Sequence, residues 1–187
     1  MWPYWLTFGI PLLLSFTYNK IDLKIYNILK YLFLCYLVLF IGLRYEVGGD
    51  WFQYEKIYKE TLEQILYFNL NLKNDVLFIN LIYLTSFISK NVVFLNFILA
   101  IVFVFSINYF LDKNSDFFFI ILTTLPIYVF LIGIGFVRQG TAISFFLISI
   151  KFLIKNKLFR SYVFFIVSLG FHKTILPFIV IYFLNIK

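Results

Sequence analysis

The sequence has few charged residues, one cysteine and one histidine, and each shortage narrows the class of protein. Only 13% of its 187 residues are charged, against about a quarter in soluble domains. The single cysteine, Cys35, excludes an intrachain disulfide and a cysteine metal cluster. The sequence has no HExxH, P-loop or GxSxG motif, so zinc hydrolysis and nucleotide chemistry have no support. We therefore expect no metal and no other cofactor.

Apolar residues make up most of the sequence. The chain is 63% hydrophobic and 24% aromatic, a composition typical of membrane proteins. Its net charge of +7 is scattered between apolar runs, without the basic stripe of a nucleic-acid-binding protein. Flanking positive charge of this kind sets orientation and contacts anionic lipid. The composition predicts an all-α, polytopic transmembrane helix bundle that has the bilayer as a partner and binds no nucleic acid.

The apolar runs set the number of membrane helices. A spanning helix needs roughly 17–25 apolar residues. Spans are predicted at 25–43, 91–111 and 117–134, with a shorter one at 139–154 and a minimal one at 2–18, kinked at Pro11. The segment 2–18 has no basic region and no small-residue cleavage site, so we expect a retained helix rather than a signal peptide. The runs 161–171 and 174–186 form either one broken span or the start of a hairpin. We expect about 6–8 membrane helices in all.

Residues 44–90 have a different pattern and are expected to form an extracytoplasmic loop with two helices. In 51–70 the residues Trp51, Tyr54 and Tyr58 recur at helical spacing with charges between them, which predicts an interfacial amphipathic helix. Pairs such as Glu55 and Lys59 can form ion pairs across one turn. The apolar run 76–89 has fourteen residues, a length more typical of a re-entrant or interfacial helix than of a span.

The topology depends on whether 76–89 crosses the membrane. If it does not cross, Arg44, Arg138 and His172 emerge on one face. The other face, which would be cytoplasmic, then holds Lys20, Lys24, Lys113, Lys155, Lys157 and Arg160. If it does cross, Arg44 and Arg138 lie on opposite sides. The distribution of positive charge does not decide between the two arrangements. We prefer the first because the run is short, and the second stays open.

Three polar segments interrupt the apolar sequence at the ends of predicted spans. The first is RYEVGGD, which contains Arg44, Glu46, Gly48, Gly49 and Asp50. The second is GIGFVRQG, with Arg138 and Gln139, and the third is GFHK, with His172. An ionisable group at a bilayer edge is costly unless it is paired or faces a wet cavity. Two arginines on one face, with glycines that let backbone N–H groups approach an anion, indicate phosphate binding.

The same residues also fit structural roles. Arg44 can snorkel at a helix end and pair with Glu46 or Asp50. Asp50 can cap the helix expected from Trp51, and a lone interfacial histidine such as His172 is often a hydrogen-bonded structural residue. A histidine beside a phosphate site is equally suited to proton transfer, so both interpretations stay open.

In these motifs the sequence resembles the EpsG-like branch of the O-antigen and exopolysaccharide polymerases, the Wzy-type membrane enzymes. The matching motifs are Arg44 followed by Gly48 or Gly49, Asp50, Trp51 and Tyr54, then Arg138-Gln139-Gly140 with Ala142, and then Phe171-His172-Lys173. Each motif alone is weakly specific, whereas three motifs in the family's order are more specific. The resemblance covers residues 1–187, and it implies a single integral membrane domain that is truncated at its C-terminus.

The resemblance implies a glycosyltransferase of the bacterial cytoplasmic (inner) membrane. Such polymerases join undecaprenyl-pyrophosphate-linked oligosaccharide repeat units into O-antigen or exopolysaccharide at the outer face of that membrane. On this hypothesis Arg44 and Arg138 bind pyrophosphate, and Gln139, Gly48 and Gly49 contribute to substrate binding. His172 is the base, with Asp50 or Glu46 as its orienting partner or as an alternative base. A chain-length regulator and a flippase are conceivable partners.

Three other functions fit the same motifs. A non-enzymatic component of polysaccharide export, flippase-like or regulatory, also needs cations for a lipid pyrophosphate but needs no base. An O-antigen ligase-like transferase uses the same donor with a different acceptor. An inactive fragment keeps the motifs without the activity. The sugars and their linkage cannot be read from these residues.

Overall fold

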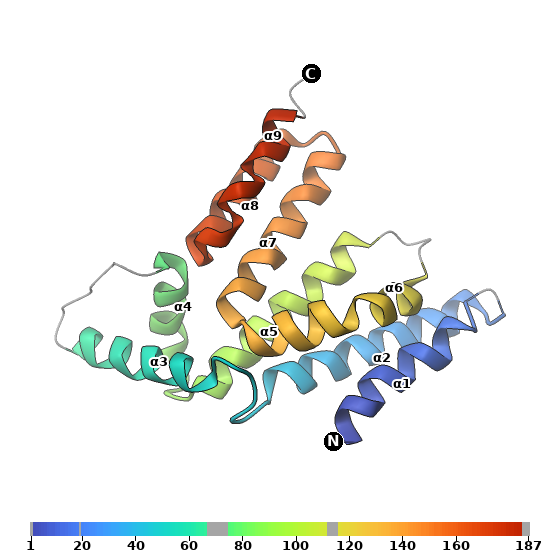
Figure 1. Cartoon of the computed structure of the whole chain (residues 1–187), viewed down its shortest axis with the longest axis horizontal. Helices are drawn as coiled ribbons and strands as arrows, with labels where there is room; N and C mark the ends of the chain where they lie inside the picture. Colours follow the sequence, from blue (N-terminus) through green and yellow to red (C-terminus); the bar gives the residue numbers. More distant parts are fainter. Residues whose placement is uncertain (1, 19, 67–74, 112–115, 185–187) are drawn as a thin grey trace.

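The computed structural model describes residues 2–18, 20–66, 75–111 and 116–184, and within these ranges the chain folds into helices without strands (Figure 1). In chain order the helices are α1 Trp2–Ser15, α2 Leu23–Gly42, α3 Trp51–Leu66, α4 Val76–Ser86, α5 Val92–Phe110, α6 Phe117–Thr124, the π-helix Leu125–Gly135, α7 Val137–Ile154, α8 Leu158–Phe171, the 3₁₀ segment Lys173–Ile179 and α9 Val180–Leu184. The predicted all-α bundle is confirmed.

Four of the described helices are long and apolar enough to cross a membrane. They are α2, α5, the continuous helix Phe117–Gly135 and α7, and they correspond to four of the predicted spans. Helix α1 has 14 residues and ends three residues short of the predicted run 2–18. Helices α4 and α8 and the segment Lys173–Tyr182 are apolar but shorter.

Several helices begin where a short polar side chain caps the first turn. Asp22 accepts a hydrogen bond from the backbone N–H of Lys24 over 2.9 Å, and Asn91 accepts one from Val93 over 2.8 Å. These oxygens satisfy N–H groups that have no partner within the helix. The caps explain why α2 and α5 start abruptly beside polar residues.

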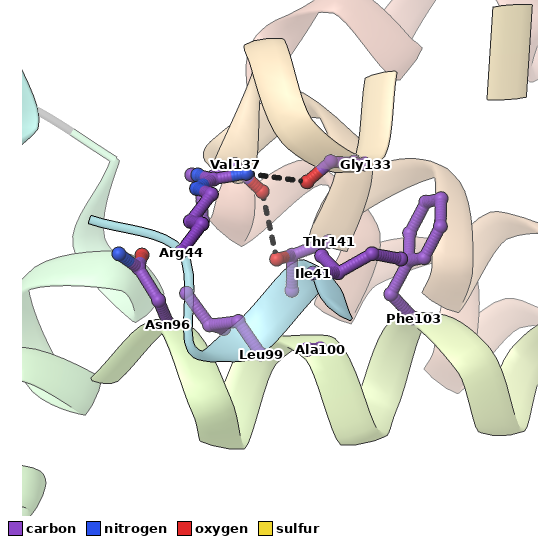
Figure 2. A pocket seen from close by; sticks show the side chains of 10 residues that line it. Ile41, Arg44, Asn96, Leu99, Ala100, Phe103, Gly133, Val137 and Thr141 are labelled. Carbon is purple, nitrogen blue, oxygen red and sulfur yellow. Dashed lines mark hydrogen bonds between the residues drawn. The ribbon is translucent and has the colours of Figure 1, made fainter. Parts of the chain in front are cut away.

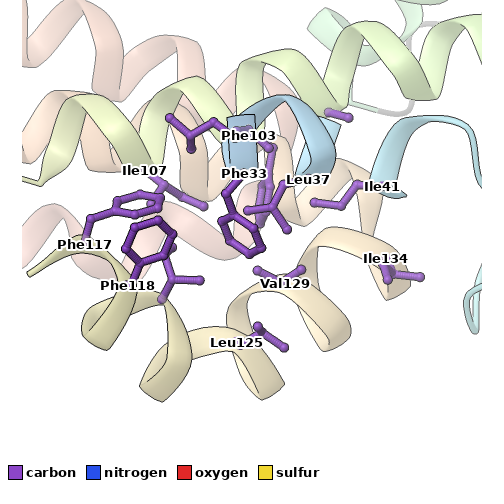
Figure 3. Packing of buried hydrophobic residues seen from close by; sticks show 14 of the residues in the cluster. Phe33, Leu37, Ile41, Phe103, Ile107, Phe117, Phe118, Leu125, Val129 and Ile134 are labelled. Carbon is purple, nitrogen blue, oxygen red and sulfur yellow. The ribbon is translucent and has the colours of Figure 1, made fainter. Parts of the chain in front are cut away.

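Helix α5 lies between two hydrophobic clusters. The first joins it to α1, α2, α6 and the π-helix, with Phe33, Phe103 and Phe118 at its centre (Figure 3). The second joins it to α3, α4, α7, α8 and α9. Lipid is as apolar as these side chains, so close packing rather than exclusion of water distinguishes the folded arrangement in a membrane.

Helix α3 is amphipathic as predicted, but its aromatic face packs on protein rather than on lipid. Trp51, Tyr54 and Tyr58 are buried, and the Tyr58 hydroxyl donates to the Ser89 carbonyl over 3.1 Å. On the opposite face the predicted ion pair between Lys59 and Glu55 forms at 2.8 Å. The last predicted helical residues, 67–70, lie outside the described residues.

Helix α4 is too short to cross a membrane. Its 11 residues extend roughly 16 Å, against a hydrocarbon core of about 30 Å. It ends at Ser86, three residues before the end of the predicted run 76–89. This length favours the arrangement in which 76–89 does not cross, and that topology stays a prediction.

Candidate functional site

Two of the three polar segments found in the sequence meet around Asp75, at one end of the bundle. One carboxylate oxygen of Asp75 lies 3.0 Å from Nη1 of Arg138 and 3.2 Å from Nδ1 of His172. The Asp75 side chain is 8% exposed, whereas Arg138 is 18% and His172 is 28% exposed. A nearly buried acid thus holds two groups that reach further toward the surface.

Three helix ends bring this triad together. Asp75 directly precedes α4, yet its side chain makes no capping hydrogen bond there. Arg138 lies in the first turn of α7, and His172 directly follows α8. An ionised carboxylate only accepts hydrogen bonds, so the Asp75 contact requires the Nδ1–H tautomer of neutral His172. The free Nε2 is then able to take a proton.

Arg44 lies deeper, at the end of the π-helix (Figure 2). Its Nη1 donates to the Gly133 carbonyl over 2.8 Å, and the residue is 8% exposed. A helix C-terminus carries unsatisfied carbonyls and partial negative charge, so a guanidinium is favourable there. Burial lowers the pKa of Arg44 to about 10, which still leaves it protonated at neutral pH.

A glycine seats the Arg44 loop on the π-helix. Gly48 has φ +112°, and a Cβ at this position would lie 2.5 Å from the Ile134 carbonyl oxygen. Only glycine combines that backbone conformation with such a close approach. A Cβ at Gly49 would meet no atom within 4 Å. The fold therefore requires glycine at position 48 but has room for a side chain at position 49.

Tyr54 of α3 packs against Arg138. The guanidinium carbon of Arg138 is 5.5 Å from the centre of its ring, a cation–π distance. Burial raises the pKa of Tyr54, and Arg138 opposes that rise. The buried ring thus supports the Arg138 guanidinium from the side of α3.

An open polar cleft lies next to this triad. It has a volume of about 290 Å³ and is lined by Gln53, Lys56, Ile57, Glu60 and Arg138. Arg138 is the member of the triad that reaches this cleft. The cleft provides room for a polar ligand beside a charged arginine and beside the first turn of α7, where the helix dipole favours anions.

A second, much smaller cavity lies behind Arg44. Its volume is about 10 Å³, which is the space of one water molecule. It is lined in part by Arg44, Asn96 and Thr141, shown together in Figure 2. Nε of Arg44 and Nδ2 of Asn96 are buried donors without a partner among the described residues. Arg44 therefore contacts the Gly133 carbonyl and also lines this small cavity.

The remaining predicted site residues lie at the same end with different surroundings. Glu46 is exposed and has φ 52°, and its carboxylate raises the pKa of the neighbouring Tyr45 hydroxyl. Asp50 is half-buried directly before α3, and Gln139 is half-buried in the first turn of α7. The carboxylate that contacts His172 is Asp75, so the predicted orienting role of Asp50 or Glu46 is not what the geometry shows.

Two polar residues of this site were absent from the sequence-based prediction. Asp75 directly precedes a long apolar run, and an acid at that position is costly unless it is paired. Asn96 is a buried amide inside a span, which is similarly unusual. Both signals are readable in the sequence, but neither names its partner.

A helix bundle able to cross a membrane, with a guanidinium, a carboxylate and an imidazole joined at one end, defines a polytopic membrane protein with a candidate anion-binding site. The family model described as the EpsG family matches residues 27–187. The chain belongs to the EpsG family, a family of membrane proteins of exopolysaccharide biosynthesis. Comparison with curated proteins and with solved structures gives no match.

Proposed function

We propose that this protein is a polysaccharide polymerase. It joins undecaprenyl-pyrophosphate-linked oligosaccharide repeat units at the outer face of the bacterial cytoplasmic membrane. The observation that carries the proposal is the contact of one buried carboxylate, Asp75, with both Arg138 and His172. A cation for a leaving pyrophosphate and a base for an acceptor hydroxyl are the two groups that such a transfer needs.

Arg138 is the proposed direct ligand of the pyrophosphate. Its guanidinium lines the open cleft and presents a planar fork of donors that matches phosphate oxygens. The dipole of α7 adds positive potential at the same place, the first turn of this helix. Gln139, half-buried in this turn, and Asp50 are proposed to contact sugar hydroxyls.

His172 is the proposed general base. The acceptor hydroxyl of the incoming unit attacks the anomeric carbon of the growing chain, and Nε2 of His172 takes its proton. A bond forms between the acceptor oxygen and that carbon, while the bond from carbon to pyrophosphate oxygen breaks. The electron pair leaves on undecaprenyl pyrophosphate, next to Arg138. Asp75 fixes the imidazole and stabilises its protonated form.

Arg44 has a supporting role in this proposal. The sequence-based hypothesis gave it the pyrophosphate together with Arg138. Arg44 is buried and donates to the Gly133 carbonyl. It therefore acts as a fixed positive charge that does not contact the ligand and that also holds the end of the π-helix. Gly48 supports it by seating the loop on the π-helix.

Polymer length in cells tests the proposal. His172→Gln and Arg138→Gln are each expected to leave single repeat units in place of long polymer, at normal protein level. Lys173→Gln, an exposed neighbour of the histidine, is the matched control and should give full-length polymer. Full-length polymer from His172→Gln would show that His172 is not the base and would contradict the proposed mechanism.

The location of the unused repeat units separates this proposal from a transport function. A lost polymerase leaves lipid-linked single units on the outer face, where they are accessible to an added glycosidase. A lost flippase leaves them on the inner face. Accumulation on the inner face in the Arg138→Gln cells would favour an export component instead.

A further inference from the structure

An apolar groove lies on the bundle between α5, α7 and α8, away from the candidate site. Its volume is about 380 Å³, and aromatic rings of Phe105, Tyr109, Phe145, Phe152 and Phe164 form most of its wall. Adjacent rings are in contact, with centroid distances of 5.8 Å between Tyr109 and Phe152 and 5.4 Å between Phe152 and Phe164. Contacts between neighbouring rings thus run along the groove wall.

The groove has the length of one lipid leaflet. Along α5 it extends from Ile101 to Tyr109, a rise of roughly 12 Å, close to half of the hydrocarbon thickness of about 30 Å. On α7 it likewise occupies the half that ends at Ile154. It therefore opens toward the end of the bundle opposite to Arg138 and His172.

Two cations stand at the open end of the groove. The Nζ atom of Lys155 lies 5.4 Å from the centre of the Tyr109 ring, and the guanidinium carbon of Arg160 lies 5.9 Å from that of Phe152. Both rings belong to the groove wall. Lys155 and Arg160 are exposed, and neither forms an ion pair within the described part of the chain. Their charge is free for an external anion.

A tight turn fixes the spacing of these cations. Asn156 adopts the left-handed conformation with φ 56°. The N–H of Lys157 donates to the Phe152 carbonyl over 2.9 Å, and that of Asn156 donates to Leu153 over 2.9 Å. This pair of bonds is the Schellman motif, which ends α7 and reverses the chain into α8. Lys155 and Arg160 are thus carried on either side of one ordered turn.

We propose that the groove binds one acyl chain of an anionic phospholipid, and that Lys155 and Arg160 bind its phosphate. Charge complementarity favours this occupant over an uncharged lipid or a protein helix. In the preferred topology this end shares its membrane face with Lys20 and Lys24, and that face is the cytoplasmic one. The cytoplasmic leaflet is the one rich in anionic lipid. This site is separate from the proposed polymerase site and does not depend on it.

Native mass spectrometry of the purified chain tests the proposal with phosphatidylglycerol and phosphatidylcholine as probes. We expect tighter binding of phosphatidylglycerol, and about 30-fold weaker binding in the double variant Lys155→Gln/Arg160→Gln, because each basic residue near an anionic headgroup contributes about fivefold. The control Lys20→Gln/Lys24→Gln removes the same charge from the same end, away from the groove, and should bind as the wild type does.

A groove variant tests the acyl chain independently. Ile101→Trp narrows the groove at a partly exposed position, where misfolding is not expected, and should weaken phosphatidylglycerol binding at least tenfold. Three results would overturn the proposal: equal binding of the two lipids, equal weakening in both double variants, or unchanged binding in Ile101→Trp. The second of these would indicate diffuse surface charge, and the third an occupant other than an acyl chain.

Discussion

Replacing Asp75 by asparagine tests the geometry of the candidate site most directly. The change keeps the size of the side chain and removes the charge that Arg138 and His172 share. At 3.0 Å from Arg138, the attraction is roughly 5 kcal/mol at an effective dielectric constant of about 20. Desolvation of the two groups cancels most of it. Because Arg138 and His172 remain partly exposed, we expect a net loss of about 1–3 kcal/mol in the free energy of unfolding.

The effect of Asp75→Asn on transfer is expected to be much larger than the effect on folding. An amide can donate to Nδ1 of His172 and so favour the wrong tautomer, in which Nε2 carries the proton. Loss of a correctly oriented base costs about 10²–10⁴-fold in rate. The assay is polymerisation of lipid-linked repeat units by the chain in proteoliposomes, with thermal unfolding followed in parallel.

Glu46→Gln is the matched control, because Glu46 is exposed at the same end of the bundle. It should leave the polymerisation rate within about threefold of the wild type, since no charge near the imidazole changes. A normal rate in Asp75→Asn together with a lost rate in Glu46→Gln would refute the assignment of Asp75. The double variant Asp75→Asn/Arg138→Gln should lose less free energy of unfolding than the two single losses add up to, because the two residues interact directly.

Three further predictions concern the supports of the site. Gly48→Ala should destabilise the fold by about 1–3 kcal/mol, because its positive φ and a carbonyl 2.5 Å from the new Cβ both oppose a side chain, while Gly49→Ala should be neutral; equal thermal midpoints would contradict this. Gly133→Ala places a Cβ 2.9 Å from an aromatic ring, and Gly135→Ala meets nothing within 4 Å, so thermal unfolding should show a loss of about 1–3 kcal/mol for the first substitution only. Burial lowers the pKa of Arg44 to about 10, so the unfolded chain binds this proton more tightly. The free energy of unfolding should therefore rise with pH from about 10 up to the ordinary pKa of an arginine. In Arg44→Met the free energy of unfolding, measured at alkaline pH, should not show this rise. A rise that persists in the variant would exclude Arg44 as its source.

The sequence was sufficient to predict the helices but not their fine structure. Apolar length alone located α2, α5 and α7, because a span requires a run that is easily recognised. The same criterion placed the start of the last of these at Gln139, whereas α7 begins at Val137. Helix ends depend on caps and on neighbouring chain, and the apolar pattern contains no information about either. Arg138 therefore lies inside the first turn rather than in a preceding loop.

The partners of the polar residues were the harder part to predict. Composition and motif order singled out Arg44, Arg138 and His172, since charged groups are rare in this chain. Their contacts depend on side-chain packing between segments far apart in sequence. Asp75 lies 63 residues from Arg138 and 97 from His172, and no periodic pattern links such distant positions. The burial of Arg44 likewise follows from the seating of its loop on the π-helix.

The length of α4 connects the topology to the proposed chemistry. Its 11 residues are too few to cross a bilayer, so in the preferred topology Asp75 and the start of α5 lie at the same end as the last turn of α2. Asp75 is therefore available to the first turn of α7 and to the end of α8, which both reach that end. A crossing at this point would have put Arg44 and Arg138 on opposite sides. The carboxylate would then have lain at the end of Arg44, with Arg138 and His172 at the other end. A short helix thus allows one acid to hold a cation from the start of α7 and a base from the end of α8.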